Sequence, residues 1–183
     1  MMSTVPAFAA PNDPISTTDA GQGTIQFTGS VIDAPCSIPS DSQNIQVDLG
    51  QVNLKRLDAE NKHSDAVPVT INLTGCSFTE GDAGKPAKLS KVAVTFPGVQ
   101  TPSAEAAKKN GEIVNGASDA ATNVVIQLLK ADGTSPVDLS NATPPTEGDI
   151  QLDATSSTNK LQFFAQILAT GTATAGNVGA TVT

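Results

Sequence analysis

Histidine, serine and the acidic residues are the side chains that could give this chain catalytic chemistry. His63 is the only histidine, and it lies in the polar stretch of residues 60–65, where a solvated loop imidazole is a simpler interpretation than a general base. No serine has the Gly-x-Ser-x-Gly context of a nucleophile elbow. Paired carboxylates for glycoside hydrolysis are neither indicated nor excluded. The candidates are scattered over expected turns and strand ends: Asp132, Asp138, Asp149 and Asp153. The sequence predicts a protein that is not an enzyme.

Metal and cofactor chemistry is not indicated either. The two cysteines, Cys36 and Cys76, lie about 40 residues apart and fit neither a Cys-x-x-Cys redox pair nor a four-ligand zinc site. Asp119, Glu147 and Asp149 lack the spacing and the glycine of a calcium loop. A disulfide between the two cysteines is the economical interpretation, and two unrelated buried thiols are the alternative. We expect no metal and no cofactor.

Charge and composition exclude several classes of protein. The chain has 18 acidic and 10 basic residues and a net charge of −8, which is unfavourable for binding nucleic acid or an anionic bilayer. No apolar run is long enough to insert into a membrane. Hydrophobic residues make up 38% and charged residues 15% of the chain, as in globular proteins. At 183 residues, one domain is the expectation.

The N-terminal residues have features of an exported protein. Ala7-Phe8-Ala9 before Ala10 has the small-x-small form of a signal-peptidase site, so residues 1–9 are interpreted as the remnant of a signal peptide, with an ordinary flexible terminus as the alternative. Together with the paired cysteines this favours an oxidising compartment. Residues 10–22 are rich in Pro, Asp, Ser, Thr and Gly without apolar periodicity, which predicts a mobile arm.

Alternating apolar residues predict a fold built of strands. Residues 23–31 place Ile25, Phe27, Gly29 and Val31 on one face, as in a strand with one buried side. Similar or continuous apolar segments follow at residues 43–49, 67–73, 91–96, 123–130, 161–169 and 178–183. Asp132-Gly133 signals a hairpin, and only residues 54–61 and 104–110 have helical character. The pattern favours an all-β sandwich of immunoglobulin-like type.

Several of these segments carry motifs that occur in the same order in one family. They are Gly23-Thr-Ile-Gln-Phe-Thr-Gly-Ser-Val31 followed by Ala34-Pro-Cys36, then residues 45–50, 69–76, 124–134, 163–167 and 176–180. Over about residues 10–183 the chain resembles the subunits of chaperone-usher fimbriae, of the type 1 and P pilus class.

The resemblance implies a specific architecture and set of partners. The fold would be an incomplete immunoglobulin-like sandwich (the pilin fold) that lacks its seventh strand, formed by residues 34–183, with residues 10–33 as an N-terminal donor-strand extension. Ile25, Phe27, Gly29 and Val31 would enter the groove of a neighbouring subunit, and the alternative is that they form the domain's own first strand. A periplasmic chaperone and an outer-membrane usher would be the other partners, and the fibre would be extracellular after export through the periplasm.

The C-terminal segment departs from the family pattern. Family members end near a penultimate tyrosine, whereas this sequence ends at Ala180-Thr-Val-Thr183 and contains no Tyr, so we expect a truncated last strand. A structural fimbrial subunit is the favoured function, with a receptor- or glycan-binding tip protein as the alternative. That alternative is disfavoured because there is no room for a separate lectin domain and no Trp or Tyr for sugar stacking. The sequence does not distinguish a major shaft subunit from a minor adaptor or a terminator.

Overall fold

The computed structural model describes residue 26 and residues 34–81, 83–85, 87–141 and 148–183. The chain divides into two units, Met1–Asp33 and Ala34–Thr183, and the fold is described for the second. The expected signal-peptide remnant, arm and donor-strand residues Ile25, Phe27, Gly29 and Val31 therefore lie outside the described residues.

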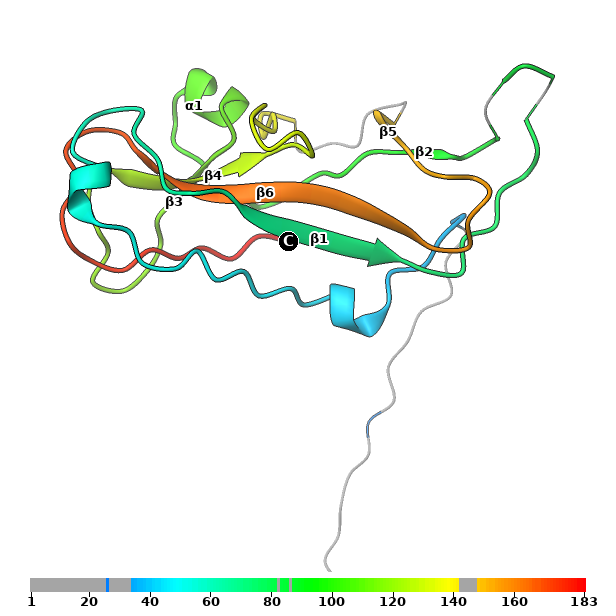
Figure 1. Ribbon diagram of the computed structural model, residues 1–183, viewed down its shortest axis with the longest axis horizontal. Helices are drawn as coiled ribbons and strands as arrows, with labels where there is room; N and C mark the ends of the chain where they lie inside the picture. The colour runs from blue at the N-terminus through cyan, green and yellow to red at the C-terminus, as the bar shows by residue number, and fades with distance from the viewer. Residues whose placement is uncertain (1–25, 27–33, 82, 86, 142–147) are drawn as a thin grey trace, which may run out of the picture. The chain divides into compact units, whose positions relative to one another are not determined.

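An antiparallel sheet of four strands, in the order β1-β6-β4-β3, forms the centre of the second unit (Figure 1). The strands are β1 (Val67–Leu73), β3 (Glu112–Val114), β4 (Val124–Leu129) and β6 (Asn159–Ala169). β6 is the longest, and it pairs with β1 from Val67↔Ala165 to Leu73↔Asn159 on one side and with β4 on the other. Both faces of β4 are buried, which explains its continuous apolar sequence.

The remaining elements are short. They are the 3-10 turns η1 (Ser40–Ser42) and η2 (Leu54–Arg56), the helix α1 (Glu105–Lys109), and the two-stranded pair β2 (Lys91–Val92) and β5 (Ile150–Gln151). None of the helices in the described part of the chain has the length and apolarity to cross a membrane.

Alternate residues of the central strands form the hydrophobic core on one face of the sheet. On β6 these are Leu161, Phe163, Ala165, Ile167 and Ala169, all buried. The rings of Phe96 and Phe163 meet edge to face, with centroids 6.1 Å apart, an arrangement that aromatic quadrupoles favour. The period of two therefore directs one set of apolar side chains to the same face of the sheet.

The opposite face of the sheet is held by side-chain amides. Glu112, Gln127 and Gln166 stand in register across β3, β4 and β6. The buried Gln166 Nε2 donates to Gln127 Oε1 at 2.7 Å, and Gln127 Nε2 donates to the Asn110 carbonyl oxygen at 2.9 Å. Because a buried polar group without a partner is costly, these bonds make the two glutamines compatible with the interior.

Most of the predicted long elements are confirmed. β1 spans the predicted residues 67–73, and β4, β6 and α1 lie at the predicted positions with shifted ends. The predicted turn at Asp132-Gly133 is present, with Gly133 at φ 69° and its N–H donating to the Lys130 carbonyl oxygen. Hydrogen bonds from Ser135, and further ones from Thr134, lower the pKa of the exposed Asp132 to about 2.

Two predicted strands do not form as such within the described residues. Residues 43–49 and 178–183 are in no strand of this chain, although both have alternating apolar residues. A strand requires a second backbone for its ladder, and residues 44–52 make no backbone–backbone hydrogen bond to other described residues. The predicted strand at 91–96 shortens to β2, the helix at 54–61 shortens to η2, and β3 and β5 were not predicted.

Candidate functional site

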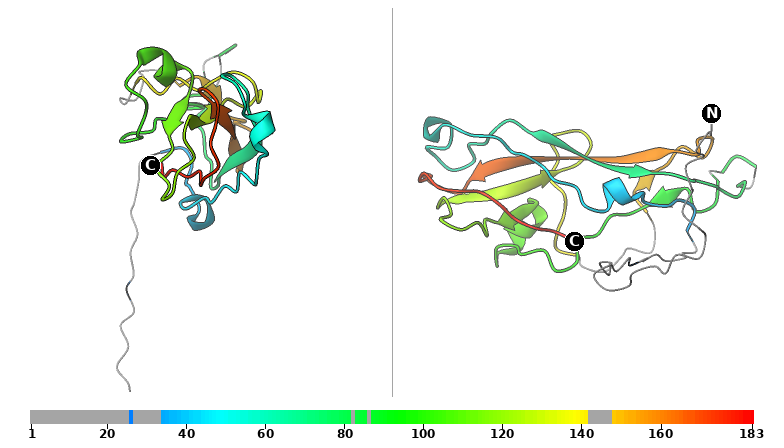
Figure 2. Two further views of the ribbon diagram at one scale, coloured as in Figure 1. Left: turned by 90° about the vertical axis from the view of Figure 1, so that its left-hand side faces the viewer. Right: turned by 90° about the horizontal axis from the view of Figure 1, so that it is seen from below.

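A groove of about 1250 Å³ lies over the apolar face of the four-stranded sheet. Its first wall is residues 43–52, and its second wall is residues 174–182. Figures 1 and 2 show the two segments on the same side of the sheet. The floor is the core face of the sheet together with Phe96: Val69, Ile71, Ile113, Val124, Ile126, Leu128, Phe163, Ala165 and Ile167. A long apolar floor between two separated segments has the shape of a binding site for an extended peptide.

The first wall presents apolar side chains and a backbone without a ladder partner. Ile45, Val47 and Leu49 alternate along it and all line the groove. Ile45 keeps 37% of its surface exposed. Among the described residues no backbone group of residues 44–52 bonds to another backbone group. This is the chemistry of an unpaired sheet edge, which can accept one more strand.

The second wall is tied to the loop at residues 115–121. Asn177 N–H donates to the Asp119 carbonyl oxygen at 2.9 Å, and Ala121 N–H donates to the Asn177 carbonyl oxygen at 2.9 Å. The Asn115 side chain bridges Asn177 and Gly179, with bonds of 2.8 and 3.0 Å. This side-chain bridge fixes the start of the wall, whereas residues 180–182 make no backbone–backbone bond within the described chain.

Glycine is required at one point of the second wall. A Cβ on Gly176 would lie 2.4 Å from the backbone nitrogen of Ala121, far closer than two such atoms can approach. The close approach of the two backbones positions the following residues along the groove, so the motif Gly176-Asn177 has a structural purpose.

One end of the groove is formed by η2. Leu54 and Leu57 line it, and Leu57 is buried. The Arg56 guanidinium donates two hydrogen bonds to the Asp65 carboxylate, at 2.9 and 3.1 Å. These bonds, followed by the charge of Arg56, hold the pKa of Asp65 below its ordinary value. The ion pair is exposed, so it orients the turn more than it stabilises the domain.

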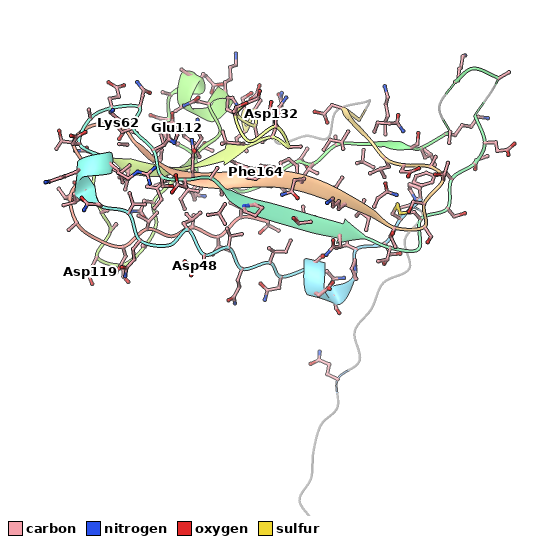
Figure 3. All side chains as sticks on the ribbon, in the orientation of Figure 1. Asp48, Lys62, Glu112, Asp119, Asp132 and Phe164 are labelled. Carbon is pink, nitrogen blue, oxygen red and sulfur yellow. A yellow bond between two sulfur atoms is a disulfide. The ribbon has the colours of Figure 1, made fainter. Side chains whose placement is uncertain are left out.

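The side chains considered for catalysis do not meet in the groove. Among the described residues that line the groove, Asp48 is the only charged one. His63 is exposed, and its Nδ1 lies 2.8 Å from the Ser64 carbonyl oxygen. Asp132, Asp138 and Asp153 accept hydrogen bonds from nearby residues in their own turns, and Figure 3 shows Asp132 and Asp119 apart from one another. In the part of the chain that the structure describes, no three His, Cys, Asp or Glu side chains are grouped to bind a metal ion.

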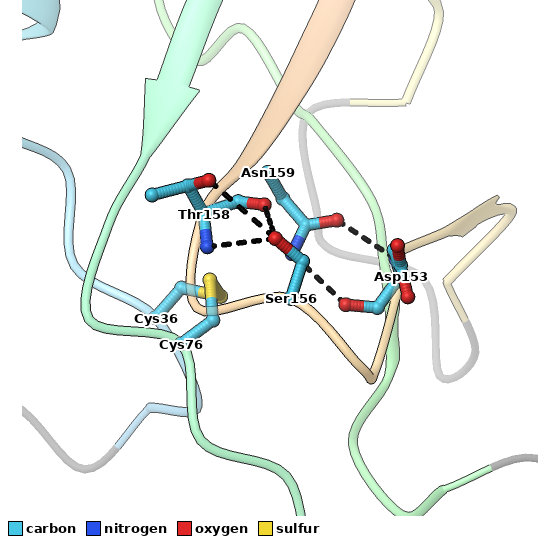
Figure 4. The surroundings of a disulfide bond; sticks show 6 residues. All are labelled: Cys36, Cys76, Asp153, Ser156, Thr158 and Asn159. Carbon is cyan, nitrogen blue, oxygen red and sulfur yellow. Dashed lines mark hydrogen bonds between the residues drawn. A yellow bond between two sulfur atoms is a disulfide. The ribbon is translucent and has the colours of Figure 1, made fainter.

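The predicted disulfide is confirmed. Cys36 and Cys76 are bonded to one another (Figure 4), so the alternative of two unrelated thiols is wrong. The Cys76 N–H donates to the Ser157 carbonyl oxygen at 2.9 Å. In the chain-entropy model, a disulfide that closes a loop of this length restricts the unfolded chain and so stabilises the folded protein by roughly 4 kcal/mol.

Comparisons with known proteins agree with this geometry. The family model described as fimbrial protein matches residues 25–183. This chain belongs to the fimbrial protein family. The fimbrial subunit is 37% identical to an uncharacterized fimbrial-like protein, YbgD, of Escherichia coli K12, over 93% of this chain and 87% of that one. It is also 36% identical to the F17 fimbrial protein of Escherichia coli, over 91% and 87% of the two chains.

Solved structures show the same fold. A chain from the structure of a chaperone-usher pilus matches with a TM-score of 0.65 and 24% identity, over 95% of this chain and 96% of that chain. The P pilus rod subunit PapA matches with a TM-score of 0.55 and 20% identity, over 81% and 95%. The mostly-β fold is therefore that of pilus subunits. The family and its fimbrial relatives show that the protein is a structural subunit that polymerises with neighbouring subunits into an extracellular fibre. The tip-protein alternative has less support from these relatives.

The family resemblance implied a groove, but the sequence alone did not show that residues 43–52 form one of its walls. Sequence reasoning assigned residues 43–49 and 178–183 to strands of the domain's own sheets, although these segments are the groove walls. A signal was present in the alternation of Ile45, Val47 and Leu49, but alternation alone does not tell whether the partner strand comes from the same chain or from another.

Proposed function

We propose that this subunit polymerises by donor-strand exchange, in which its groove receives the N-terminal extension of a neighbouring subunit. One observation carries the proposal: an apolar floor lies between a first wall whose residues 44–52 have no backbone partner among the described residues and a second wall that is unpaired at residues 180–182. An added strand would bond to the free backbone groups of the walls and place alternate side chains on the floor, which is the known mode of β-strand addition.

The extension of this chain has the pattern that such a groove accepts. Ile25, Phe27 and Val31 fall on one face of the alternating segment. Burying three such side chains is worth roughly 1.5 to 3 kcal/mol each, or about 5 to 9 kcal/mol together, before the cost of ordering the extension is subtracted. We therefore assign residues 10–33 as the donor extension and residues 34–183 as the pilin domain.

The open groove explains the proposed assembly partners. An open apolar groove beside a wall of unpaired backbone favours aggregation, so the groove must be covered between synthesis of the subunit and its assembly. A periplasmic chaperone would supply that cover, and an outer-membrane usher would exchange it for the next extension. Export through the periplasm is also consistent with the Cys36–Cys76 disulfide. The protein acts through this structural assembly and not through catalysis.

A synthetic peptide tests the proposal directly. A fluorescently labelled peptide of residues 22–33 is expected to bind the full chain and to compete with fibre growth. The matched control has the same composition with Ile, Phe and Val of residues 24–31 placed next to one another, which removes the alternation in every register that a free peptide can adopt. Equal binding of the two peptides, measured by fluorescence anisotropy, would contradict the proposal.

Gly29 gives a second test, because it lies on the apolar face of the donor segment. We expect it to occupy a shallow part of the groove, where a larger side chain is overpacked by roughly 1 to 3 kcal/mol or more. Gly29→Ala should slow fibre assembly slightly, and Gly29→Leu should slow it severely. If Gly29 instead formed a bulge with positive φ, the two variants would assemble equally poorly.

A further inference from the structure

The start of the pilin domain is fastened to the end of β1 by several bonds. The disulfide joins Cys36 to Cys76, and Ser37 exchanges two backbone hydrogen bonds with Thr74, at 2.8 and 2.9 Å. The Ser77 N–H donates to the Pro35 carbonyl oxygen at 2.8 Å. We name residues 35–37 and 74–77 the junction. Figure 4 shows its disulfide beside the loop of residues 153–159.

The junction lies between the N-terminal extension and the first wall of the groove along the chain. It follows the extension, which ends at residue 33, and it precedes the first wall of the groove, residues 43–52. A second fastening comes just before the wall, where the Asn72 N–H donates to Ser42 Oγ at 3.1 Å. Any tension that enters the domain at residue 34 therefore reaches the junction before it reaches the wall.

The wall itself is poorly suited to bear tension. Its residues 44–52 have no backbone–backbone bond to other described residues, and in the fibre their proposed partner is the donor strand of a neighbour. A pull along the chain could therefore peel the wall from the floor and loosen that strand. β1, by contrast, is paired with β6 over seven residues, from Val67↔Ala165 to Leu73↔Asn159. Hydrogen bonds are individually weak and break in turn when they are peeled, whereas a covalent bond persists.

We infer that the junction is a mechanical clamp, in which the disulfide passes tension from the extension to β1 and keeps it from the first wall of the groove. This inference rests on the proposed donor-strand exchange, because that exchange makes the extension the link that bears load between subunits. With the clamp, a subunit could be pulled through its own extension by one neighbour without releasing the donor strand that the other neighbour has placed in its groove.

Pulling on single fibres of the full chain tests the clamp. Oxidised fibres are compared with the same fibres after mild reduction, and circular dichroism establishes that the reduced subunits stay folded. Reduction is expected to lower the force at which subunits separate. It should also add a lengthening step before separation, which the contour length of residues 37–52, at about 3.5 Å each, limits to less than about 55 Å per subunit.

Two controls separate the clamp from other effects of reduction. Fibres of the double variant Cys36→Ser, Cys76→Ser should behave like reduced fibres with or without reductant. Ser42→Ala keeps the disulfide and removes only a fastening beyond it, so the oxidised Ser42→Ala fibre should separate at the force of the parent fibre.

The outcomes distinguish the clamp from the proposed function. A peptide of residues 22–33 that binds the oxidised and reduced chains equally, combined with a lower separation force after reduction, supports the clamp. Equal separation forces overturn the clamp and leave donor-strand exchange standing. Fibres that dissolve on reduction without load also overturn it, since the disulfide would then act on folding alone. A peptide that binds neither chain overturns both proposals.

Discussion

Replacing Ile45 with Asp is expected to weaken binding of the donor peptide by roughly 100-fold or more and to stop fibre growth, while the subunit stays folded. Ile45 lines the groove and is 37% exposed, so a carboxylate there keeps much of its hydration in the free subunit. A donor strand in the groove would cover it, and burying an unpaired carboxylate costs several kcal/mol. Every 1.4 kcal/mol is a factor of ten in the dissociation constant.

Ile38→Asp is the matched control for this substitution. Ile38 is also an exposed isoleucine, at 46%, and it is not among the residues that line the groove. The Ile38→Asp subunit should bind the peptide and form fibres like the parent chain. Anisotropy with the peptide of residues 22–33 and negative-stain microscopy provide the two readouts. Equal behaviour of the two variants would show that the donor strand does not occupy the groove next to Ile45.

The elements that the sequence could predict are those stabilised within one chain. β1 and β4 were predictable because alternation or continuous apolar character over six or seven residues distinguishes a buried strand from a turn. The disulfide was the economical interpretation of Cys36 and Cys76, since their spacing fits no other common use of two cysteines. The fold class followed from these features together with the family motifs.

The parts that could not be predicted depend on contacts distant in sequence. β2 and β5 are only two residues long, and such strands exist because Val92 pairs with Ile150, which no local pattern reveals. Residues 43–49 have the sequence of a strand, yet they lack a backbone partner among the described residues. Their alternation therefore predicted the chemistry of the wall correctly and its pairing within the chain wrongly.

Phe27→Asp tests the donor strand, whereas Ile45→Asp tests the groove that receives it. The expected effect of Phe27→Asp is the loss of fibre growth from the variant's own extension, because the substitution removes a Phe side chain worth roughly 1.5 to 3 kcal/mol and buries a carboxylate instead. Together these changes cancel most of the estimated gain from the donor strand. Gln26→Asp is the control, since Gln26 is exposed and falls on the opposite face of the alternating segment.

Loss of the donor strand and loss of the groove can be distinguished, because each subunit of a fibre donates a strand to one neighbour and accepts a strand from the other. The Phe27→Asp subunit keeps an intact groove, so it should still bind the peptide of residues 22–33, whereas the Ile45→Asp subunit should not. Small amounts of Phe27→Asp subunit mixed with parent subunit should shorten the fibres, because such a subunit accepts a strand and donates none. If residues 25–31 instead formed the domain's own first strand, Phe27→Asp would unfold the monomer in thermal denaturation, and the mixed fibres would keep the parent length.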